Sequence, residues 1–121
     1  MLQKENRLKK RKEFNYVYKK GEIAHSTSFY VHSTKSWRKM PKIGISVSKQ
    51  VGNSVVRSRV KRIISEACRL NINKFANRNY VITAKEAAKD KSSLEIETEL
   101  LYLLKKMNQT STKPQTEDKN A

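Results

Sequence analysis

The amino-acid sequence predicts a single small domain of the α+β class. Its 121 residues suffice for one domain with one modest core. Apolar residues follow helical spacing in some segments and alternate as in strands in others, in the order helix, strands, basic helix, strand, helix. Cys68 is the only cysteine, which excludes an intramolecular disulfide framework and a zinc site built on several thiolates. A reducing, cytoplasmic setting fits this composition.

The chain begins with a strongly basic segment. Residues 1–12 contain six lysines and arginines and few apolar residues. This composition is typical of a mobile arm that can reach phosphates. The candidate phosphate contacts in the arm are Lys9, Lys10 and Arg11.

A short helix is expected next, over residues 13–20. Phe14, Val17 and Tyr18 have the i, i+3, i+4 spacing of one helical face. Gly21 follows two lysines and predicts the end of the helix, because glycine accepts the left-handed conformation and lysines suit the negative end of the helix dipole.

Segments with the alternation of strands follow this helix. Within residues 23–33, Tyr30 and His32 point to one face and their neighbours to the other. Residues 33–42 lack periodicity and are expected to form a loop. Residues 43–48 then combine a bulky apolar face with a second face of very small side chains, namely Gly44, Ser46 and Ser48. Such a small-residue face lets a ligand come close to the backbone.

The helix expected over residues 54–70 is the most informative segment. Gly52 and Asn53 form a turn before it, and Asn53 or Ser54 can cap its first turn. One stripe of the helix is apolar and predicts the side that faces the core: Val56, Val60, Ile63, Ile64 and Ala67. The opposite side carries Ser58, Arg62, Ser65 and Arg69, and the borders of the stripe carry Arg57, Lys61 and Arg59.

The last third of the chain is expected to complete the core. Residues 79–84 have the composition of a strand, and a Ser92–Glu95 capping box begins a final helix that ends near Met107. Residues 108–121 are polar and aperiodic, so we expect a disordered tail after one folded domain, residues 1–107. No apolar run approaches the roughly 20 residues of a membrane span, and no apolar signal core follows the start. We therefore expect neither a membrane protein nor an exported one.

Positive charge is concentrated in the first part of the chain. The 27 lysines and arginines outnumber the 11 acidic residues and give a net charge of +16. The first 70 residues contain 18 basic and four acidic side chains, whereas residues 91–121 are balanced. Repulsion among so many positive charges opposes the compact state. The charge therefore indicates a polyanionic partner, and nucleic acid is the first candidate.

The sequence offers no self-contained active site. His25 and His32 lack the spacing of a metal pair and have no neighbours that suggest a catalytic dyad. The glycines are scattered and form no phosphate-binding loop. We therefore expect no catalytic and no metal-binding residues, and any catalysis would come from a partner.

Aromatic side chains could add base stacking to this charge. Phe14 and Tyr18 share a helical face that also has to serve the core. Alternatively, they line a groove together with Tyr30 and His32, where single-stranded bases could stack. Periodicity leaves both interpretations open.

The middle of the chain resembles the signature region of the bacterial ribonuclease P protein component. The resemblance is carried by residues 44–70, in which the family's motif residues are Lys49, Gly52, Asn53, Arg57, Arg59, Lys61 and Arg62. The opening and closing helices also look like those of the family, so that the likeness covers residues 6–107. Ser58 stands where the family's Arg-Asn-Arg triplet has its asparagine, Ser65 replaces a frequent basic residue, and His32 replaces a frequent aromatic residue.

The resemblance implies a particular fold. It is a four-stranded sheet with helices packed on it, in the order α-β-β-β-α-β-α, similar to a domain of a small-subunit ribosomal protein. A left-handed βαβ crossover is part of this fold, although about 98% of such crossovers are right-handed.

The resemblance also implies a function, which is to assist a catalytic RNA and its Mg²⁺ ions in removing the 5′ leader from precursor tRNA. The implied partners are that catalytic RNA and precursor tRNA, with no cofactor bound by the protein alone. The residues implied for the catalytic RNA are Lys49, Asn53, Arg57, Arg59, Lys61 and Arg62. Those implied for a leader-binding cleft are Phe14, Tyr18, Tyr30, His32, Ser46 and Ser48.

Two other classes fit part of the same pattern. A structural RNA-binding protein of ribosomal type would share the charge and the small sheet. A DNA-binding regulator fits less well, because the arginines run along the helix and no separate helix-turn-helix is visible.

Overall fold

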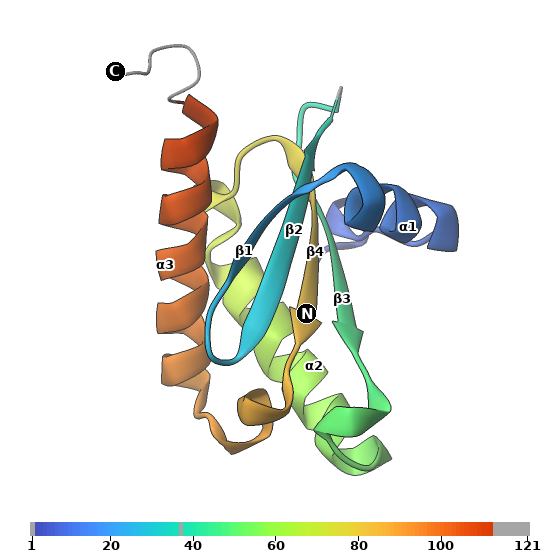
Figure 1. Ribbon diagram of the computed structural model, residues 1–121, viewed down its shortest axis with the longest axis vertical. Helices are drawn as coiled ribbons and strands as arrows, with labels where there is room; N and C mark the ends of the chain where they lie inside the picture. Colours follow the sequence, from blue (N-terminus) through green and yellow to red (C-terminus); the bar gives the residue numbers. More distant parts are fainter. Residues whose placement is uncertain (1, 37, 113–121) are drawn as a thin grey trace.

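The computed structural model describes residues 2–36 and 38–112. Three helices and four strands form the fold of this part of the chain (Figure 1): α1 (Arg11–Lys20), β1 (Glu22–His25), β2 (Phe29–Lys35), β3 (Lys42–Val47), α2 (Ser54–Leu70), β4 (Arg78–Ala84) and α3 (Ser93–Thr112). Short 3-10 turns lie between them: η1 (Lys4–Asn6), η2 (Lys49–Val51), η3 (Ile72–Lys74) and η4 (Glu86–Asp90). The predicted α+β class is confirmed.

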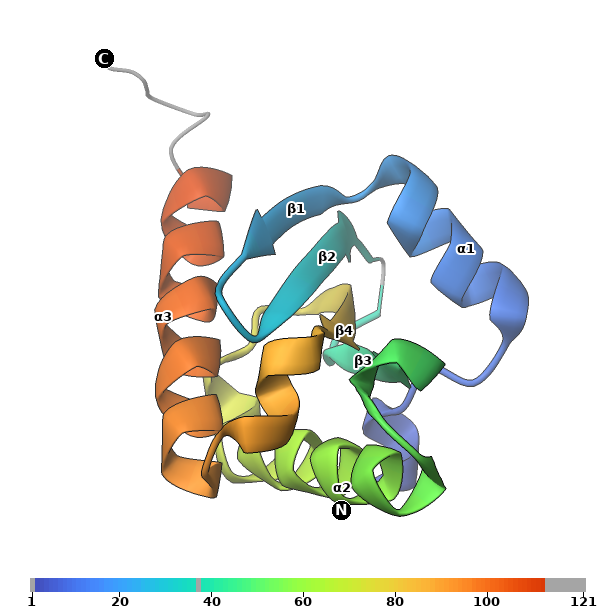
Figure 2. The same ribbon diagram turned by 60° about the horizontal axis from the view of Figure 1, so that its bottom comes forward.

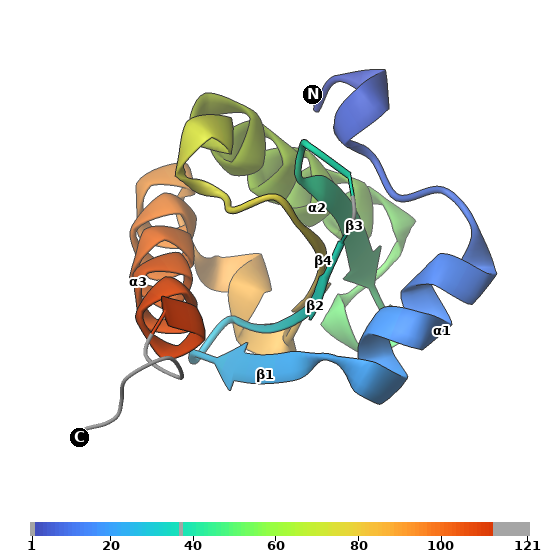
Figure 3. The ribbon, with the colours of Figure 1, turned by 90° about the horizontal axis from the view of Figure 1, so that it is seen from above.

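The strands form one mixed sheet in the order β1-β2-β4-β3. β2 pairs antiparallel with β1 and β4, whereas β3 pairs parallel with β4 and is an edge strand. β3 and β4 point the same way in Figure 1, and α2 connects them behind the sheet, as the view from above in Figure 3 also shows. This arrangement makes the crossover left-handed, as the resemblance implied.

The helices cover the two faces of the sheet unequally. α2 and α3 pack on one face, and α1 lies on the other (Figures 2 and 3). The main core lies between the sheet and α2 and α3, where side chains such as Tyr80, Ile82 and Leu100 are fully buried. α1 covers only part of its face, so that this side of the sheet remains available for a partner.

The segment expected as one alternating stretch, residues 23–33, is a hairpin in the structure. β1 ends at His25, and β2 begins at Phe29. The turn is fastened to α3, because the Ser28 N–H and hydroxyl donate hydrogen bonds of 3.1 and 2.7 Å to the Glu99 carboxylate. The alternation of Tyr30 and its neighbours is confirmed, since alternate β2 side chains are buried.

The N-terminal segment, residues 2–8, packs on the domain, so the prediction of a mobile arm is wrong for this segment. Leu2 and Leu8 are only 4% and 6% exposed. The Leu8 N–H donates to the Ile43 carbonyl at 3.0 Å, and the Leu2 N–H donates to the Ser65 hydroxyl at 3.3 Å. Ser65 is consequently buried, although its helical position predicted a solvent-facing side chain.

Two helix boundaries also differ from the predicted ones. α1 begins at Arg11, two residues before the predicted start, and α3 continues past Met107 to Thr112. The first five residues of the predicted disordered tail are therefore helical. The rest of that tail, residues 113–121, and Trp37 lie outside the described residues.

Candidate nucleic-acid interface

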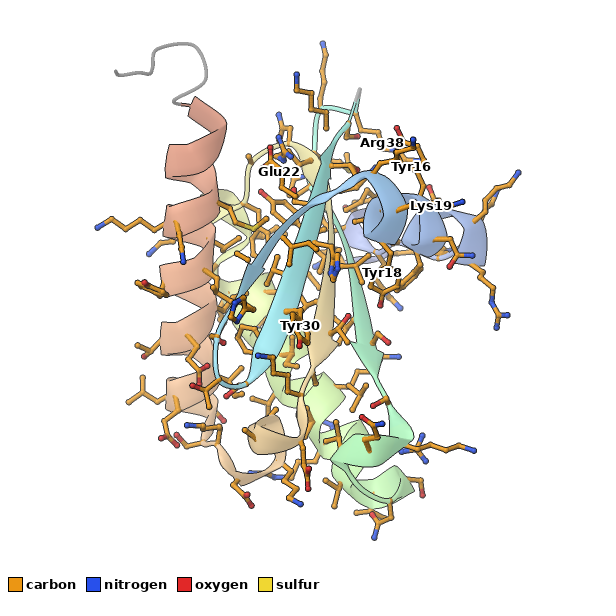
Figure 4. All side chains as sticks on the ribbon, in the orientation of Figure 1. Tyr16, Tyr18, Lys19, Glu22, Tyr30 and Arg38 are labelled. Atoms are coloured by element: carbon orange, nitrogen blue, oxygen red, sulfur yellow. The ribbon has the colours of Figure 1, made fainter. Side chains whose placement is uncertain are left out.

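The sheet face beneath α1 is built from cross-strand rows of side chains. One row, called here the covered row, consists of Ile23, His32, Val81 and Gly44 from β1, β2, β4 and β3. The next row, called the open row, consists of His25, Tyr30, Thr83 and Ser46. α1 packs on His32, Val81 and Gly44 of the covered row, whereas Ile23 at its β1 end is 60% exposed. The open row remains accessible, with Tyr18 at the boundary (Figure 4).

Phe14 packs directly on the backbone of β3. A Cβ added to Gly44 would overlap the Phe14 ring, so that glycine is required for this close approach. Phe14 also belongs to a small apolar cluster with Leu8, Val17 and Val81. The structure therefore gives Phe14 a packing role, and its ring is only partly buried.

Tyr18 connects α1 to both rows of side chains. Its hydroxyl shares a 3.0 Å hydrogen bond with the Thr83 hydroxyl in the open row. Its ring meets His32 edge to face, with 4.8 Å between the ring centroids. Because Tyr18 is still 36% exposed, it can offer an aromatic surface beside the open row.

His32 is held in a dehydrated position under this contact. Its Nδ1 is buried and has no hydrogen-bond partner in the described part of the chain. Burial lowers the pKa of His32 below its ordinary value of 6.5. The neutral imidazole is therefore favoured near neutral pH.

Tyr30 is the tyrosine of the open row, and it is 42% exposed. The Lys85 ammonium lies 4.3 Å from the centroid of its ring. Lys85 is held there because its Nζ donates a 2.6 Å hydrogen bond to the Ser26 carbonyl. The ring of His25 lies 6.0 Å away on the neighbouring strand. Aromatic surface and positive charge thus occur together at this end of the row.

Five of the six residues predicted for the leader-binding cleft lie on this face: Phe14, Tyr18, Tyr30, His32 and Ser46. Ser48 lies outside the rows, beyond the end of β3 and next to η2. The sequence reasoning missed Ile23, His25, Thr83 and Lys85. The alternation of β1 could have indicated Ile23 and His25 once its pairing with β2 was known, but no sequence signal indicated Lys85.

The basic residues of the predicted RNA surface lie on η2 and on the first half of α2, namely Lys49, Arg57, Arg59, Lys61 and Arg62, and Asn53 is the N-cap of α2. Arg57 and Lys61 lie beside the edge of β3, where they line a pocket of about 250 Å³. Arg59 lies on the other side of the helix, and its Nη1 donates to the Lys89 carbonyl at 3.4 Å. The helix thus carries cations along both borders of its buried stripe, as predicted.

Asn53 and Arg57 also have structural contacts at the start of α2. The Asn53 Oδ1 accepts a 3.0 Å hydrogen bond from the Val56 N–H and caps the helix. The Arg57 Nε donates to the Gly52 carbonyl at 3.1 Å, which orients its guanidinium group.

The three residues assigned to the arm have fixed places in the structure. Arg11 is the first residue of α1, and Lys10 is its N-cap, whose backbone N–H donates to the Glu13 carboxylate at 3.5 Å. Lys9, Lys10 and Arg11 are all exposed. They therefore extend the basic surface at the start of α1.

The two candidate surfaces lie on opposite faces of the sheet and meet around β3. Phe14 of α1 and Lys61 of α2 line one pocket of about 150 Å³, together with Gly44 of β3 and Arg7 of the N-terminal segment. The edge strand therefore forms a bridge between the aromatic surface and the basic surface.

None of the helices in residues 2–36 and 38–112 is both long and apolar enough for a bilayer span. The same residues contain no group of three or more histidine, cysteine or acidic side chains suited to a metal ion.

Comparisons with known proteins show the family of this chain. The family model for ribonuclease P matches residues 2–108. The ribonuclease P protein component of Clostridium botulinum (strain 657 / Type Ba4) is 42% identical over 105 residues, which cover 85% of this chain and 95% of the relative. That of Staphylococcus haemolyticus is 36% identical over 104 residues, which cover 86% of this chain and 91% of the relative.

Solved structures of ribonuclease P proteins are similar to this one. A Staphylococcus aureus RNase P protein mutant with defective mRNA degradation activity has a TM-score of 0.81 and 33% identity, and the match covers 87% of this chain and 90% of that one. The RNase P protein from Thermotoga maritima has a TM-score of 0.77 at 24% identity, covering 83% and 96%, and supports the fold alone. Because the family model spans most of the chain and the relatives match over nearly their whole length, the protein belongs to the ribonuclease P protein component family.

Proposed function

We propose that this protein helps a catalytic RNA to remove the 5′ leader from precursor tRNA, as the protein subunit of ribonuclease P. Two surfaces of different chemistry support this proposal, because they lie on opposite faces of one sheet and meet at β3. Such an arrangement would let one protein hold two RNA segments side by side. Family membership supports assigning the two segments to the catalytic RNA and its substrate.

The basic surface of η2 and α2 is assigned to the catalytic RNA. Its cations are Lys49, Arg57, Arg59, Lys61 and Arg62, with Asn53 as a polar neighbour. Each phosphate that these groups neutralise releases counterions, which favours binding to folded RNA without reading its sequence. Lys9, Lys10 and Arg11 add charge at the start of α1.

The open row and the residues beside it are assigned to the single-stranded leader. Tyr18 and Tyr30 offer stacking surfaces that every base can use, so the site tolerates leaders of many sequences. His32 supports Tyr18 from below, and the small side chain of Ser46 keeps the row open on β3. Phe14 lies beside the open row, packed on Gly44 of β3.

The chemical step is assigned to the RNA. Mg²⁺ bound with that RNA would activate the water that attacks the phosphodiester and would stabilise the leaving oxygen. The contribution of the protein is to hold both RNA segments in register, with no catalytic side chain of its own. The proposed location of this activity is the cytoplasm.

Reconstitution with a bacterial catalytic RNA tests the proposal. At low Mg²⁺ concentration, adding the protein should increase the rate of 5′ cleavage of precursor tRNA, because its cations replace part of the ionic screening. The Arg59→Ala/Arg62→Ala variant should lose much of this stimulation. The Lys105→Ala/Lys106→Ala variant removes the same charge from α3 and should retain it. An unchanged cleavage rate and affinity on adding the wild-type protein would overturn the proposal.

A further inference from the structure

An ion pair connects α1 to a third row of the sheet, on the far side of the covered row from the open row. Arg38 comes from the loop between β2 and β3 and lies near α1 (Figure 4), where it contacts Asn79 of β4. Its Nη1 donates to the Asn79 Oδ1 at 3.4 Å, and its Nη2 donates to the Glu13 carboxylate at 3.0 Å. Three segments that are distant in the sequence are thereby joined at the start of α1.

Glu13 is the residue through which this contact acts on the helix. It lies in the first turn of α1, directly before Phe14, and one of its oxygens accepts the Lys10 N–H. The side chains of Arg38 and Glu13 are 29% and 27% exposed, so the pair is partly shielded from water. Burial raises the pKa of Glu13, but the hydrogen bond and the charge of Arg38, together with the backbone hydrogen bonds from Lys10 and Lys9, outweigh this effect, so that the pKa lies below its ordinary value.

α1 has few other anchors on the sheet. Its apolar contact is a small cluster, in which Val17 and Phe14 pack on Val81 and Leu8. Its polar contact near the other end is the Tyr18–Thr83 hydrogen bond. With so few anchors, a fixed contact at the first turn has a large influence on where the helix lies.

We infer that Arg38 is a positioning residue for the leader: through Glu13 it holds α1 so that Phe14 and Tyr18 lie correctly beside the open row. This inference rests on the proposed function and adds to it a residue outside the predicted RNA surfaces. Arg38 acts on the substrate through α1, while the basic surface of α2 lies on the other face of the sheet.

A direct contact between the Arg38 guanidinium and a phosphate is the competing explanation. The two explanations predict opposite effects of one substitution on leader binding. Glu13→Gln removes a negative charge from the leader side of the protein. A direct phosphate contact would be unchanged or strengthened by this loss, since Arg38 would be freed from its carboxylate. Positioning through the ion pair predicts weaker leader binding instead.

The experiment compares precursor and mature tRNA on holoenzymes that contain Glu13→Gln, Arg38→Met, both changes together, or Arg38→Lys. The matched control is Glu86→Gln, which removes the same charge and breaks the 3.2 Å Lys89–Glu86 pair on η4. The quantities to measure are the affinity of each holoenzyme for both tRNAs, kcat and KM as separate constants, and the urea midpoint of each free protein. The urea midpoints identify any variant that is no longer folded.

Each single variant should lose about three- to fivefold of the preference for precursor over mature tRNA, a range that suits an ion pair of this exposure. The loss should appear in KM with little change in kcat, and the double variant should be no worse than either single one. Arg38→Lys should not restore the preference, because lysine lacks the two-pronged geometry.

Three results would overturn the inference. They are a Glu13→Gln holoenzyme that binds precursor tRNA as tightly as the wild type or more tightly, an Arg38→Lys holoenzyme with full preference, and an equal loss in Glu86→Gln. If the wild-type holoenzyme itself showed no preference for precursor tRNA, the leader assignment of the proposed function would fail instead.

Discussion

At the scale of single residues, His32 shows how a polar group is used inside the interface. It lies in the covered row, where the edge-to-face contact with Tyr18 shields it from water. Because burial lowers the pKa of His32, the imidazole binds a proton less readily in the native state than in the unfolded chain. The contribution of neutral His32 to the free energy of unfolding is therefore fully present above the unfolded pKa, near 6.5, and is lost as the pH falls below that value.

The His32→Phe variant tests this dependence. Between pH 7 and pH 5, the free energy of unfolding of the wild-type protein should decrease, and in the variant this decrease should be smaller because the phenyl ring does not titrate. Urea unfolding across this pH range measures both slopes. Equal slopes for wild type and His32→Phe would contradict the assignment.

At the scale of elements, helices were more predictable than the segments that join or precede them. The bounds of α2, residues 54–70, and its Asn53 cap agree with the sequence pattern because helical spacing and capping are local properties. The β1–β2 turn was missed because it contains no glycine or proline, and contacts with Glu99 fix it instead. The packing of residues 2–8 was missed because two widely spaced leucines form no periodic pattern.

Asn53 has both a structural and a functional assignment, and two substitutions separate them. Asn53→Ala should lower the stability by about 1 kcal/mol through loss of the cap. Asn53→Asp should keep the cap and the stability but weaken binding to the catalytic RNA, because it adds a negative charge to the basic surface. Urea unfolding and RNA affinity measure the two effects. Ser54→Ala is the control for stability, and an Asn53→Ala protein as stable as this control would exclude the capping role.

At the scale of the whole molecule, the sheet divides the positive charge into two surfaces. The sequence pattern located most of the charge in the first 70 residues and assigned the last helix to the core. It did not show that Phe14 and Lys61 line one pocket at the edge of β3, because this arrangement depends on strand order and on the side to which α2 crosses. Strand order and crossover are tertiary properties, which only the family resemblance could supply in advance.

The division into two surfaces predicts that two substitutions have separable effects. Arg59→Ala should weaken binding of the catalytic RNA and reduce the slope of log affinity against log salt by about 0.9, the value for one phosphate contact on duplex DNA. Phe14→Leu keeps an apolar side chain on Gly44 but removes the aromatic ring, so it should leave that slope unchanged and weaken precursor relative to mature tRNA. Salt titrations of both RNAs measure these effects. An equal loss for precursor and mature tRNA in Phe14→Leu would assign Phe14 to packing alone, and an unchanged salt slope in Arg59→Ala would remove Arg59 from the RNA surface.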